Sequence, residues 1–222
     1  MIEIKNLSKK YKDGKNSDFF ALQDIDFEIA SNECVILKGA SGSGKSTLLS
    51  IIGAMSKPSN GAVLIDGVNF AKVSDDAASS FRHKKIGYIF QFFNLIEELS
   101  VYENIASPLH LCDYSQELKS KMIKEAKKLA SFDKSDFSLT KDLSGGEKQR
   151  CAIARALVNN PEIILADEPT ANLDGENSRN FVETIRLLKQ LGKTIVIATH
   201  DPVFDDLEFV DKIINLKYGK IV

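Results

Sequence analysis

The chain has 222 residues, of which 43% are hydrophobic and 27% are charged, and its formal net charge at pH 7 is −2. This composition is typical of a globular protein with one large domain, or one core with a small appended lobe. The slight negative charge argues against nucleic acid as a partner, because phosphate backbones are bound by surfaces with a strong basic excess.

The N-terminal part of the chain alternates apolar and polar side chains. Ile2 and Ile4 begin the alternation, and it returns from Phe20 to Ile29 after a break at Lys12–Gly14. A period of two residues predicts antiparallel strands that cover one side of the domain. No apolar core of signal-peptide length precedes them, and no stretch approaches the roughly 18 apolar residues of a membrane span. Any membrane component is therefore expected to be another chain.

A glycine-rich segment follows the apolar run of residues 35–38 and matches the pattern G-x-x-x-x-G-K-[ST]. The order strand, loop and helix, with the helix from Lys45 onward, predicts a phosphate-binding loop. Its glycines let backbone N–H groups point at phosphate oxygens, and the helix N-terminus adds about half a positive charge. We expect Lys45 to reach the β- and γ-phosphates and Ser46 to be a Mg²⁺ ligand. The candidate nucleotide-binding residues are Gly39, Ala40, Ser41, Gly42, Ser43, Gly44, Lys45, Ser46 and Thr47.

Two further features precede the middle of the chain. Asn60-Gly61 and Asp66-Gly67 flank the apolar run Val63–Ile65, which predicts a strand between two turns. The basic run Arg82–Lys85 is interpreted as a solvated face or as a contact to one partner.

The middle of the chain lacks a strong strand pattern from about Phe92 to Leu143. Within residues 117–132, apolar residues recur at spacings of 4, 4 and 3, which predicts an amphipathic helix; they are Leu118, Met122, Ala126 and Leu129. We therefore expect one domain over residues 1–222. In it, a helical subdomain at about 92–143 is inserted into an α/β core formed by residues 1–91 and 144–222.

The segment Leu143–Glu147, with the sequence LSGGE, opens the next expected helix. Its free N–H groups and the Ser144 hydroxyl suit an anion. An ordinary serine cap followed by glycines would also explain the segment if it stood alone.

Two acids end the next apolar run, Ile163–Ala166. Asp167 at the carboxyl end of a buried strand can hold Mg²⁺ through water, and Glu168 is then placed to act as general base on the attacking water. Taken alone, the two acids could also be a solvated strand end.

The last part of the chain predicts a strand–helix–strand unit. Residues 163–166 and 194–198 are continuous apolar runs of the kind found in parallel strands buried on both faces. The helix between them, residues 176–191, places Phe181, Ile185 and Leu188 on one face, and Gly192 ends it.

The chain has three cysteines, at positions 34, 112 and 151, and no Cys-x-x-Cys pair. Such usage is typical of reduced thiols in a cytosolic protein. Cys34 and Cys151 each lead into an apolar run, which predicts small core residues rather than nucleophiles.

Taken in order, the phosphate loop, the LSGGE segment and the acid-ended strand resemble those of the ATP-binding cassette (ABC) ATPases, and the resemblance covers essentially the whole chain. It implies an α/β fold of the P-loop NTPase class. The expected parts are a mostly parallel core sheet, an N-terminal antiparallel β subdomain and the inserted α-helical subdomain. It also implies an ATPase whose cofactors are ATP and Mg²⁺.

The resemblance extends to individual positions. Tyr11 lies at the position where the family has an aromatic ring that stacks on adenine. The alternative is that its ring only packs against neighbouring side chains. Gln91 resembles the glutamine that joins the Mg²⁺ and water site to the helical lobe, and His200 resembles the switch histidine that contacts the γ-phosphate and orients Glu168. The implied catalytic residues are Glu168, His200 and Gln91, and the implied metal ligands are Ser46, Gln91 and Asp167.

The family resemblance further implies a composite site. Ser144, Gly145 and Gly146 would face the γ-phosphate bound to a second subunit, and Asp174 lies in the family's D-loop. Two copies, or one copy and a related ATPase, would therefore enclose two ATP molecules. Glu147 stands where many members have glutamine, a common variant.

A finer resemblance, carried by the spans 40–49, 81–95 and 101–105, is to the MacB/LolD subgroup. It implies the motor subunit of a bacterial ABC transporter, peripheral on the cytoplasmic side of the membrane and driving an integral-membrane permease. Lipoprotein release, antimicrobial peptide or macrolide export, and peptide-antibiotic resistance are the implied types, in the translocase class. The alternative is an ABC ATPase for transmembrane signalling in cell division. Phe92–Leu95 is a candidate floor for a permease helix, or part of the lobe core.

Overall fold

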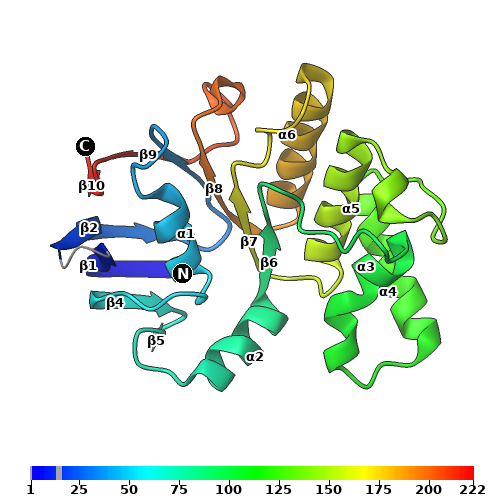
Figure 1. Cartoon of the computed structure of the whole chain (residues 1–222), viewed down its shortest axis with the longest axis horizontal. Helices are drawn as coiled ribbons and strands as arrows, with labels where there is room; N and C mark the ends of the chain where they lie inside the picture. Colours follow the sequence, from blue (N-terminus) through cyan, green and yellow to red (C-terminus); the bar gives the residue numbers. More distant parts are fainter. Residues whose placement is uncertain (1, 14–16) are drawn as a thin grey trace.

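The computed structural model describes residues 2–13 and 17–222. Two β-sheets form its framework, with helices between and beside them (Figure 1). One sheet is four-stranded, in the order β2-β1-β4-β5, and the other is six-stranded, in the order β10-β9-β3-β8-β7-β6. The predicted break at Lys12–Gly14 falls where β1 ends, and its Gly14 lies outside the described residues.

The four-stranded sheet confirms the antiparallel strands predicted from the N-terminal alternation. β1 (Ile2–Asp13) pairs with both β2 (Ser17–Ile29) and β4 (Asn60–Ile65), and β5 (Val68–Asn69) completes the edge. The turn expected at Asn60-Gly61 is wrong, because both residues belong to β4. Gly61 has a φ of 83°, and a Cβ there would lie 2.2 Å from the carbonyl oxygen of Asn6. The glycine is therefore needed for close strand approach, not for a turn.

The six-stranded sheet has a parallel core, as the continuous apolar runs predicted. Its parallel strands are β9 (Lys212–Lys217), β3 (Cys34–Lys38), β8 (Thr194–Thr199), β7 (Ile163–Asp167) and β6 (Ile86–Ile89), with β10 (Lys220–Ile221) antiparallel at one edge. Val35 and Leu37 join one apolar cluster, whereas Cys34 and Ile36 join the other. The two faces of the sheet thus form two separate cores. β6 and β9 were not predicted, because β6 is only four residues long and because exposed residues alternate with buried ones in β9.

Helix α1 (Lys45–Ile52) fills the space between the two sheets (Figure 1). On the other face of the six-stranded sheet pack α5 (Gly145–Leu157) and α6 (Gly175–Gln190). In α6, Phe181, Ile185 and Leu188 are buried as predicted, and Gly192 just beyond the helix has a φ of 79°. A left-handed glycine at this position ends the helix, since other residues adopt that conformation at a cost.

Residues 92–143 are all described, and they contain helices but no strand of either sheet. They form α3 (Val101–Ala106), η1 (Ser107–Leu111), α4 (Gln116–Leu129) and η2 (Thr140–Asp142), and α2 (Asp75–Lys85) precedes them. Figure 1 shows α3 and α4 beside α5, at the end of the molecule opposite the four-stranded sheet.

Helix α4 is the amphipathic helix predicted at 117–132, but its buried face differs from the prediction. Ile123 and Ala126 are buried, Met122 and Leu129 pack at the margin of the core, and Leu118 is 41% exposed. The helix also ends early, because Ser131 adopts a left-handed φ of 48°. No helix in the described ranges is long and apolar enough to cross a membrane.

Candidate nucleotide-binding and catalytic site

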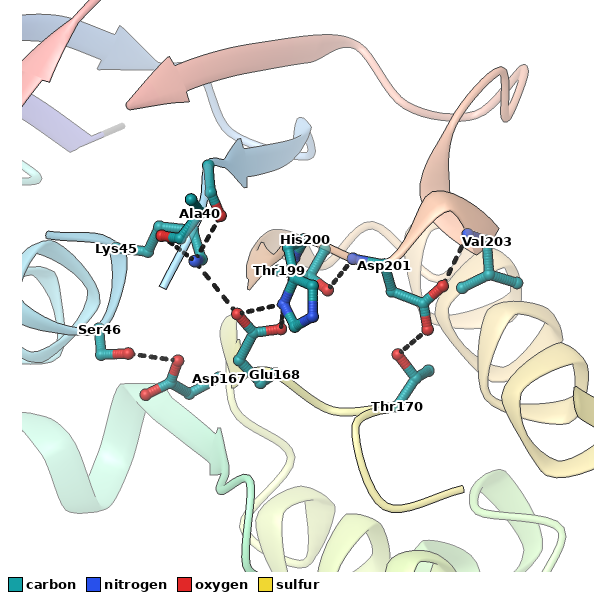
Figure 2. Close-up of polar contacts among 11 residues, drawn as sticks. Ala40, Lys45, Ser46, Asp167, Glu168, Thr170, Thr199, His200, Asp201 and Val203 are labelled. Carbon is teal, nitrogen blue, oxygen red and sulfur yellow. Dashed lines mark hydrogen bonds and ion pairs between the residues drawn. The ribbon is translucent and has the colours of Figure 1, made fainter. Parts of the chain in front are cut away.

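The loop between β3 and α1 wraps around the amino group of Lys45, whose side chain is only 5% exposed. Lys45 Nζ donates to the carbonyl oxygens of Gly39 (2.7 Å) and Ala40 (3.2 Å) and lies 3.1 Å from Glu168 Oε1 (Figure 2). Gly42 and Gly44 have φ values of 77° and 104°. These left-handed glycines curl the loop back over the start of α1.

The loop fits a nucleotide phosphate on three grounds. The first N–H groups of a helix have no partner within the helix, and Gly44, which precedes α1, provides no side-chain cap. A Cβ at Gly42 would meet nothing within 4 Å, so the loop backbone is open to a ligand. The adjoining cavity of about 520 Å³ is lined by the loop and by Tyr11, Gln91, Glu168 and His200. A cavity of this size suits a small-molecule ligand.

Ser46 and Asp167 meet where α1 begins and β7 ends. Ser46 Oγ donates a hydrogen bond of 2.8 Å to Asp167 Oδ1 (Figure 2). Burial raises the pKa of the Asp167 carboxyl, although the Ser46 hydrogen bond acts in the opposite direction. A hydroxyl and a carboxylate are oxygen ligands of the kind that Mg²⁺ takes alongside water and substrate phosphates. No group of three or more His, Cys, Asp or Glu side chains in the described ranges is placed to hold a metal, so phosphate and water oxygens would complete the shell.

Glu168 is held from two sides. His200, directly after β8, places Nδ1 3.0 Å from both carboxylate oxygens, and Lys45 lies on the other side (Figure 2). Burial raises the pKa of Glu168, but the hydrogen bonds from His200 and Lys45 and their charges together hold it below its ordinary value. Glu168 also has a φ of 42°, a conformation that costs energy in a residue with a side chain and that clusters at functional sites.

A hydrogen-bonded turn after β8 holds His200 in place. Asp201 Oδ2 accepts from Thr170 Oγ1 at 2.5 Å, and its Oδ1 accepts from the N–H of Val203 at 2.9 Å (Figure 2). The Thr170 bond ties the loop after β7 to the loop after β8. Glu168 and His200 are therefore positioned by one connected structure. Thr170 and Asp201 were not predicted as site residues, because they meet only when β7 and β8 lie side by side.

Gln91 follows β6 and lines the same cavity. Its carbonyl oxygen accepts a hydrogen bond of 2.8 Å from Asn172 Nδ2. Beyond it, Arg155 of α5 donates to the carbonyl oxygens of Phe93 and Asn94, so the loop after Gln91 is fastened to α5. Phe92 is 72% exposed, whereas Leu95 packs against the core. The segment Phe92–Leu95 is thus partly surface and partly lobe core.

Tyr11 lies on β1 at the rim of the cavity and is 41% exposed. Its ring stacks on Phe19 of β2, with centroids 5.9 Å apart and ring planes inclined by 29°. Phe19, Phe20 and Tyr218 also line the cavity, and they were not predicted as site residues. These three aromatic residues match no sequence motif. They come together only when β1 pairs with β2 and the turn between β9 and β10, which carries Tyr218, lies beside them.

Ser144 caps α5 as part of a capping box. Its side chain accepts from the N–H of Glu147, and the Glu147 carboxylate accepts from the N–H of Ser144 at 2.9 Å. The hydrogen bond from the Ser144 backbone and that from Lys134 hold the pKa of Glu147 below its ordinary value. A Cβ at Gly146 would lie 2.3 Å from Asn177 Oδ1, which explains the glycine at this position.

The structure does not bring the LSGGE segment to the phosphate loop. Ser144, Gly145 and Gly146 are absent from the described lining of the phosphate-loop cavity, and so is Asp174, which caps α6 through the N–H of Asn177. Within one chain, therefore, the phosphate loop, Gln91, Glu168 and His200 lie around one cavity, whereas Ser144–Gly146 and Asp174 lie away from it.

Comparison with known proteins identifies the same family that the sequence motifs resemble. A family model described as ABC transporter matches residues 22–171. The ABC transporter ATP-binding protein MJ0796 of Methanocaldococcus jannaschii is 42% identical over 100% of this chain and 95% of its own length. The lipoprotein-releasing system ATP-binding protein LolD of Shewanella oneidensis is 39% identical over 91% of this chain and 88% of its own length. The macrolide export ATP-binding/permease protein MacB of Chlorobaculum tepidum is 37% identical over 100% of this chain and 34% of its own length.

Solved structures show the same similarity. A dimeric structure of MJ0796 has a TM-score of 0.91 and 41% identity, covering 100% of this chain and 96% of that chain. A dimeric post-hydrolysis state of MJ0796 bound to ADP and Pi has a TM-score of 0.91 and 40% identity with the same coverage. The expected fold class is confirmed.

Proposed function

The chain belongs to the ABC transporter family, and on that premise we propose that it is the subunit of a transporter that binds and hydrolyses ATP with Mg²⁺. One observation carries the proposal. Five side chains meet at the carboxyl ends of the parallel strands β3, β7 and β8 (Figure 2). They are Lys45 and Ser46 at the start of α1, Asp167 at the end of β7 with Glu168 directly after it, and His200 directly after β8. That edge is where open parallel sheets bind their ligands.

Each group at this edge has a role that its surroundings support. The phosphate-loop amides and Lys45 would bind the β- and γ-phosphates, and Ser46 and Asp167 would hold Mg²⁺, with Gln91 as a further contact to the metal and water. Mg²⁺, when bound, neutralises negative charge on the phosphate oxygens. Tyr11 would stack on the adenine base.

Glu168 is the proposed general base, and His200 is the group that orients it. Glu168, whose pKa lies below its ordinary value, is ionised at neutral pH and can accept a proton from the attacking water. Lys45 now shares its charge with Glu168. When Lys45 donates to phosphate oxygens instead, Glu168 loses a cationic partner and becomes a stronger base. The same lysine would in this way couple phosphate binding to activation of the carboxylate.

We propose further that two copies, or one copy and a related ATPase, act together. The separation of Ser144, Gly145, Gly146 and Asp174 from the phosphate-loop cavity supports this arrangement, because those residues have no role there within one chain. The dimeric structures of MJ0796 support it as well. Each phosphate loop would then face the partner's LSGGE segment across ATP.

The relatives support a finer proposal about partners and place. LolD belongs to a lipoprotein-releasing system, and MacB is a macrolide export ATP-binding/permease protein. We propose that this chain is a translocase subunit of that type, held on the cytoplasmic side of a membrane by a permease. The lobe at about 92–143, as a helical subdomain, would contact the permease near the exposed Phe92.

The decisive experiment replaces Glu168 by Gln and measures phosphate release from Mg²⁺-ATP. We expect turnover to fall by about 10²- to 10⁴-fold, the range for loss of a general base, while ATP binding measured by titration stays within a few-fold. Glu208→Gln, at an exposed carboxylate in the loop after β8, is the matched control and should leave turnover unchanged. Undiminished turnover in Glu168→Gln would refute the assignment of the base.

A further inference from the structure

Gln149 of α5 is a buried polar residue that contacts the loop carrying the proposed base. Its side chain is 2% exposed, and its Nε2 donates to the carbonyl oxygen of Pro169 at 3.0 Å. Because a carbonyl oxygen only accepts, the amide nitrogen must face Pro169. The other amide atom, Oε1, is buried and has no hydrogen-bond partner among the described residues. Burial of an unpaired oxygen costs folding free energy, so stability alone does not explain a glutamine at this position.

The backbone next to Pro169 is strained. Glu168, which directly precedes the proline, has a left-handed φ of 42°, whereas a residue before proline normally adopts an extended conformation. Such a conformation persists only where the surrounding contacts fix it. On its N-terminal side, the Glu168 N–H donates to the carbonyl oxygen of Ala198 in β8 at 2.8 Å. The strained turn is thus held from β8 on this side.

On the C-terminal side of Glu168, Pro169 offers a single backbone group for a hydrogen bond. Proline has no N–H, so its carbonyl oxygen is the only backbone atom of that residue that can take part in one. Gln149 Nε2 donates to this oxygen from α5, a helix on the other face of the six-stranded sheet from α1. The conformation of Glu168 is therefore held from β8 on one side and from α5 on the other.

We propose that Gln149 is a positioning residue for Glu168, an inference that rests on the proposed ATPase function. Gln149 is absent from the described lining of the phosphate-loop cavity, so it acts through the backbone. By holding the Pro169 carbonyl group, it keeps the Glu168 carboxylate where Lys45 and His200 reach it. Without this hydrogen bond the strained turn can relax and carry the carboxylate away from the attacking water. A displacement of about 1 Å in a reacting group can lower the rate by about 10²-fold.

The first test replaces Gln149 by Met, which has a similar length and no donor, and measures kcat and KM with Mg²⁺-ATP. We expect kcat to fall by about 10- to 100-fold. KM, and ATP binding measured by titration, should stay within about threefold, because the phosphate loop is unchanged. The melting temperature should stay within about 3 °C, since the variant loses the unpaired oxygen together with the hydrogen bond.

The control is Thr184→Val, which also removes a hydrogen bond of a buried side chain. Thr184 Oγ1 donates to the carbonyl oxygen of Asn180 at 3.0 Å, within α6, and the variant should leave kcat unchanged. An unchanged kcat in Gln149→Met would overturn the proposal. So would a fall in kcat that only matches a loss of folded protein, because that result indicates a structural role. Gln149→Leu serves as a second variant if the methionine variant does not fold.

A double-mutant cycle tests whether Gln149 acts through Glu168. In the Glu168→Gln background, Gln149→Met should lower the residual turnover by no more than about twofold, because there is no longer a base to position. Additive losses of turnover from the two substitutions would refute a role that depends on Glu168.

The same cycle separates this inference from the proposed function. Full turnover in Glu168→Gln alone would refute the base, and Gln149 would then have nothing to position. Loss of turnover in Glu168→Gln, together with wild-type kcat in Gln149→Met, would leave the base assigned and refute only the inference about Gln149.

Discussion

The Glu168 carboxylate lies between His200 Nδ1, 3.0 Å away, and Lys45 Nζ, 3.1 Å away. His200 directly follows β8, and Lys45 opens α1 at the end of the loop that follows β3. β8 and β3 are neighbouring strands of the six-stranded sheet. The position of the proposed base is therefore determined by strand order as well as by its own strand. We therefore expect the residues around Glu168 to affect ATP hydrolysis and ATP binding to different extents.

Replacing His200 by Ala should impair hydrolysis more than binding. Loss of a hydrogen bond to a charged carboxylate is expected to lower kcat by about 10- to 100-fold, while the phosphate loop and Lys45 keep ATP affinity within about threefold. Measurement of kcat and KM with Mg²⁺-ATP checks this. His200→Gln, which can still donate a hydrogen bond, should recover part of the activity, and an unchanged kcat in His200→Ala would exclude an orienting role.

The same variant should shift the pH profile. The His200 hydrogen bond helps to hold the pKa of Glu168 below its ordinary value, so the wild-type base stays ionised into acidic solution. Without His200 the pKa rises, and the acidic limb of the kcat profile should move to higher pH. A shift to lower pH, measured between pH 4 and 8, would contradict this cause.

Asp167→Asn should stabilise the protein while it abolishes Mg²⁺-dependent hydrolysis. Burial raises the pKa of Asp167 above its ordinary 3.8, so its ionised form costs folding stability at pH 7. The amide oxygen of Asn can still accept from Ser46. We expect the melting temperature to rise by about 1–3 °C at pH 7, with the difference vanishing below about pH 3.8, where the carboxyl is neutral in both states. Asp142→Asn, at an exposed carboxylate, is the control and should not change it.

The aromatic pair at the rim of the cavity should contribute to recognition of the base. Tyr11→Ala should weaken ATP binding by about tenfold, within the range for base stacking. Phe19→Ala removes the ring stacked on Tyr11 and should weaken it by about two- to tenfold. Phe137→Ala alters a ring that is 90% exposed outside the cavity lining and should have no effect. Inorganic triphosphate should bind all four proteins alike; a parallel loss for triphosphate would contradict a base contact.

Mixing two inactive variants tests whether the site is shared. Lys45→Ala removes the phosphate-binding amine, and Ser144→Arg blocks the LSGGE segment. If each site is built from two chains, a mixed dimer keeps one intact site, and the mixture should exceed the activity of either variant alone. Subunit mixing is verified by pull-down through a tag on one variant. Mixed dimers with no gain in phosphate release would refute the composite site.

Features that depend on residues close together in the sequence were predicted better than features that depend on residues far apart. The phosphate loop, the strand before it and α1 were all predicted, because left-handed glycines and helix signals act over a few residues. The buried face of α4 was predicted less well: Leu118 fits the helical period but is 41% exposed, since the covering elements determine which residues of a stripe are buried. Asn60-Gly61 has the composition of a turn, yet close approach to β1 makes it part of a strand.

The amino-acid sequence by itself determined the residue types and local conformations of the site: the phosphate loop, the acids that end β7, and a capped helix at Ser144. Each depends on spacing within a short segment. Only the tertiary structure decided which side chains meet. Lys45 contacts Glu168, and Ser46 contacts Asp167, because β7 and β8 pair in parallel beside β3, and Ser144 lies apart from them because α5 packs on the other face of the sheet. Such contacts follow from burial of both sheet faces, a property of the whole chain that no single segment carries.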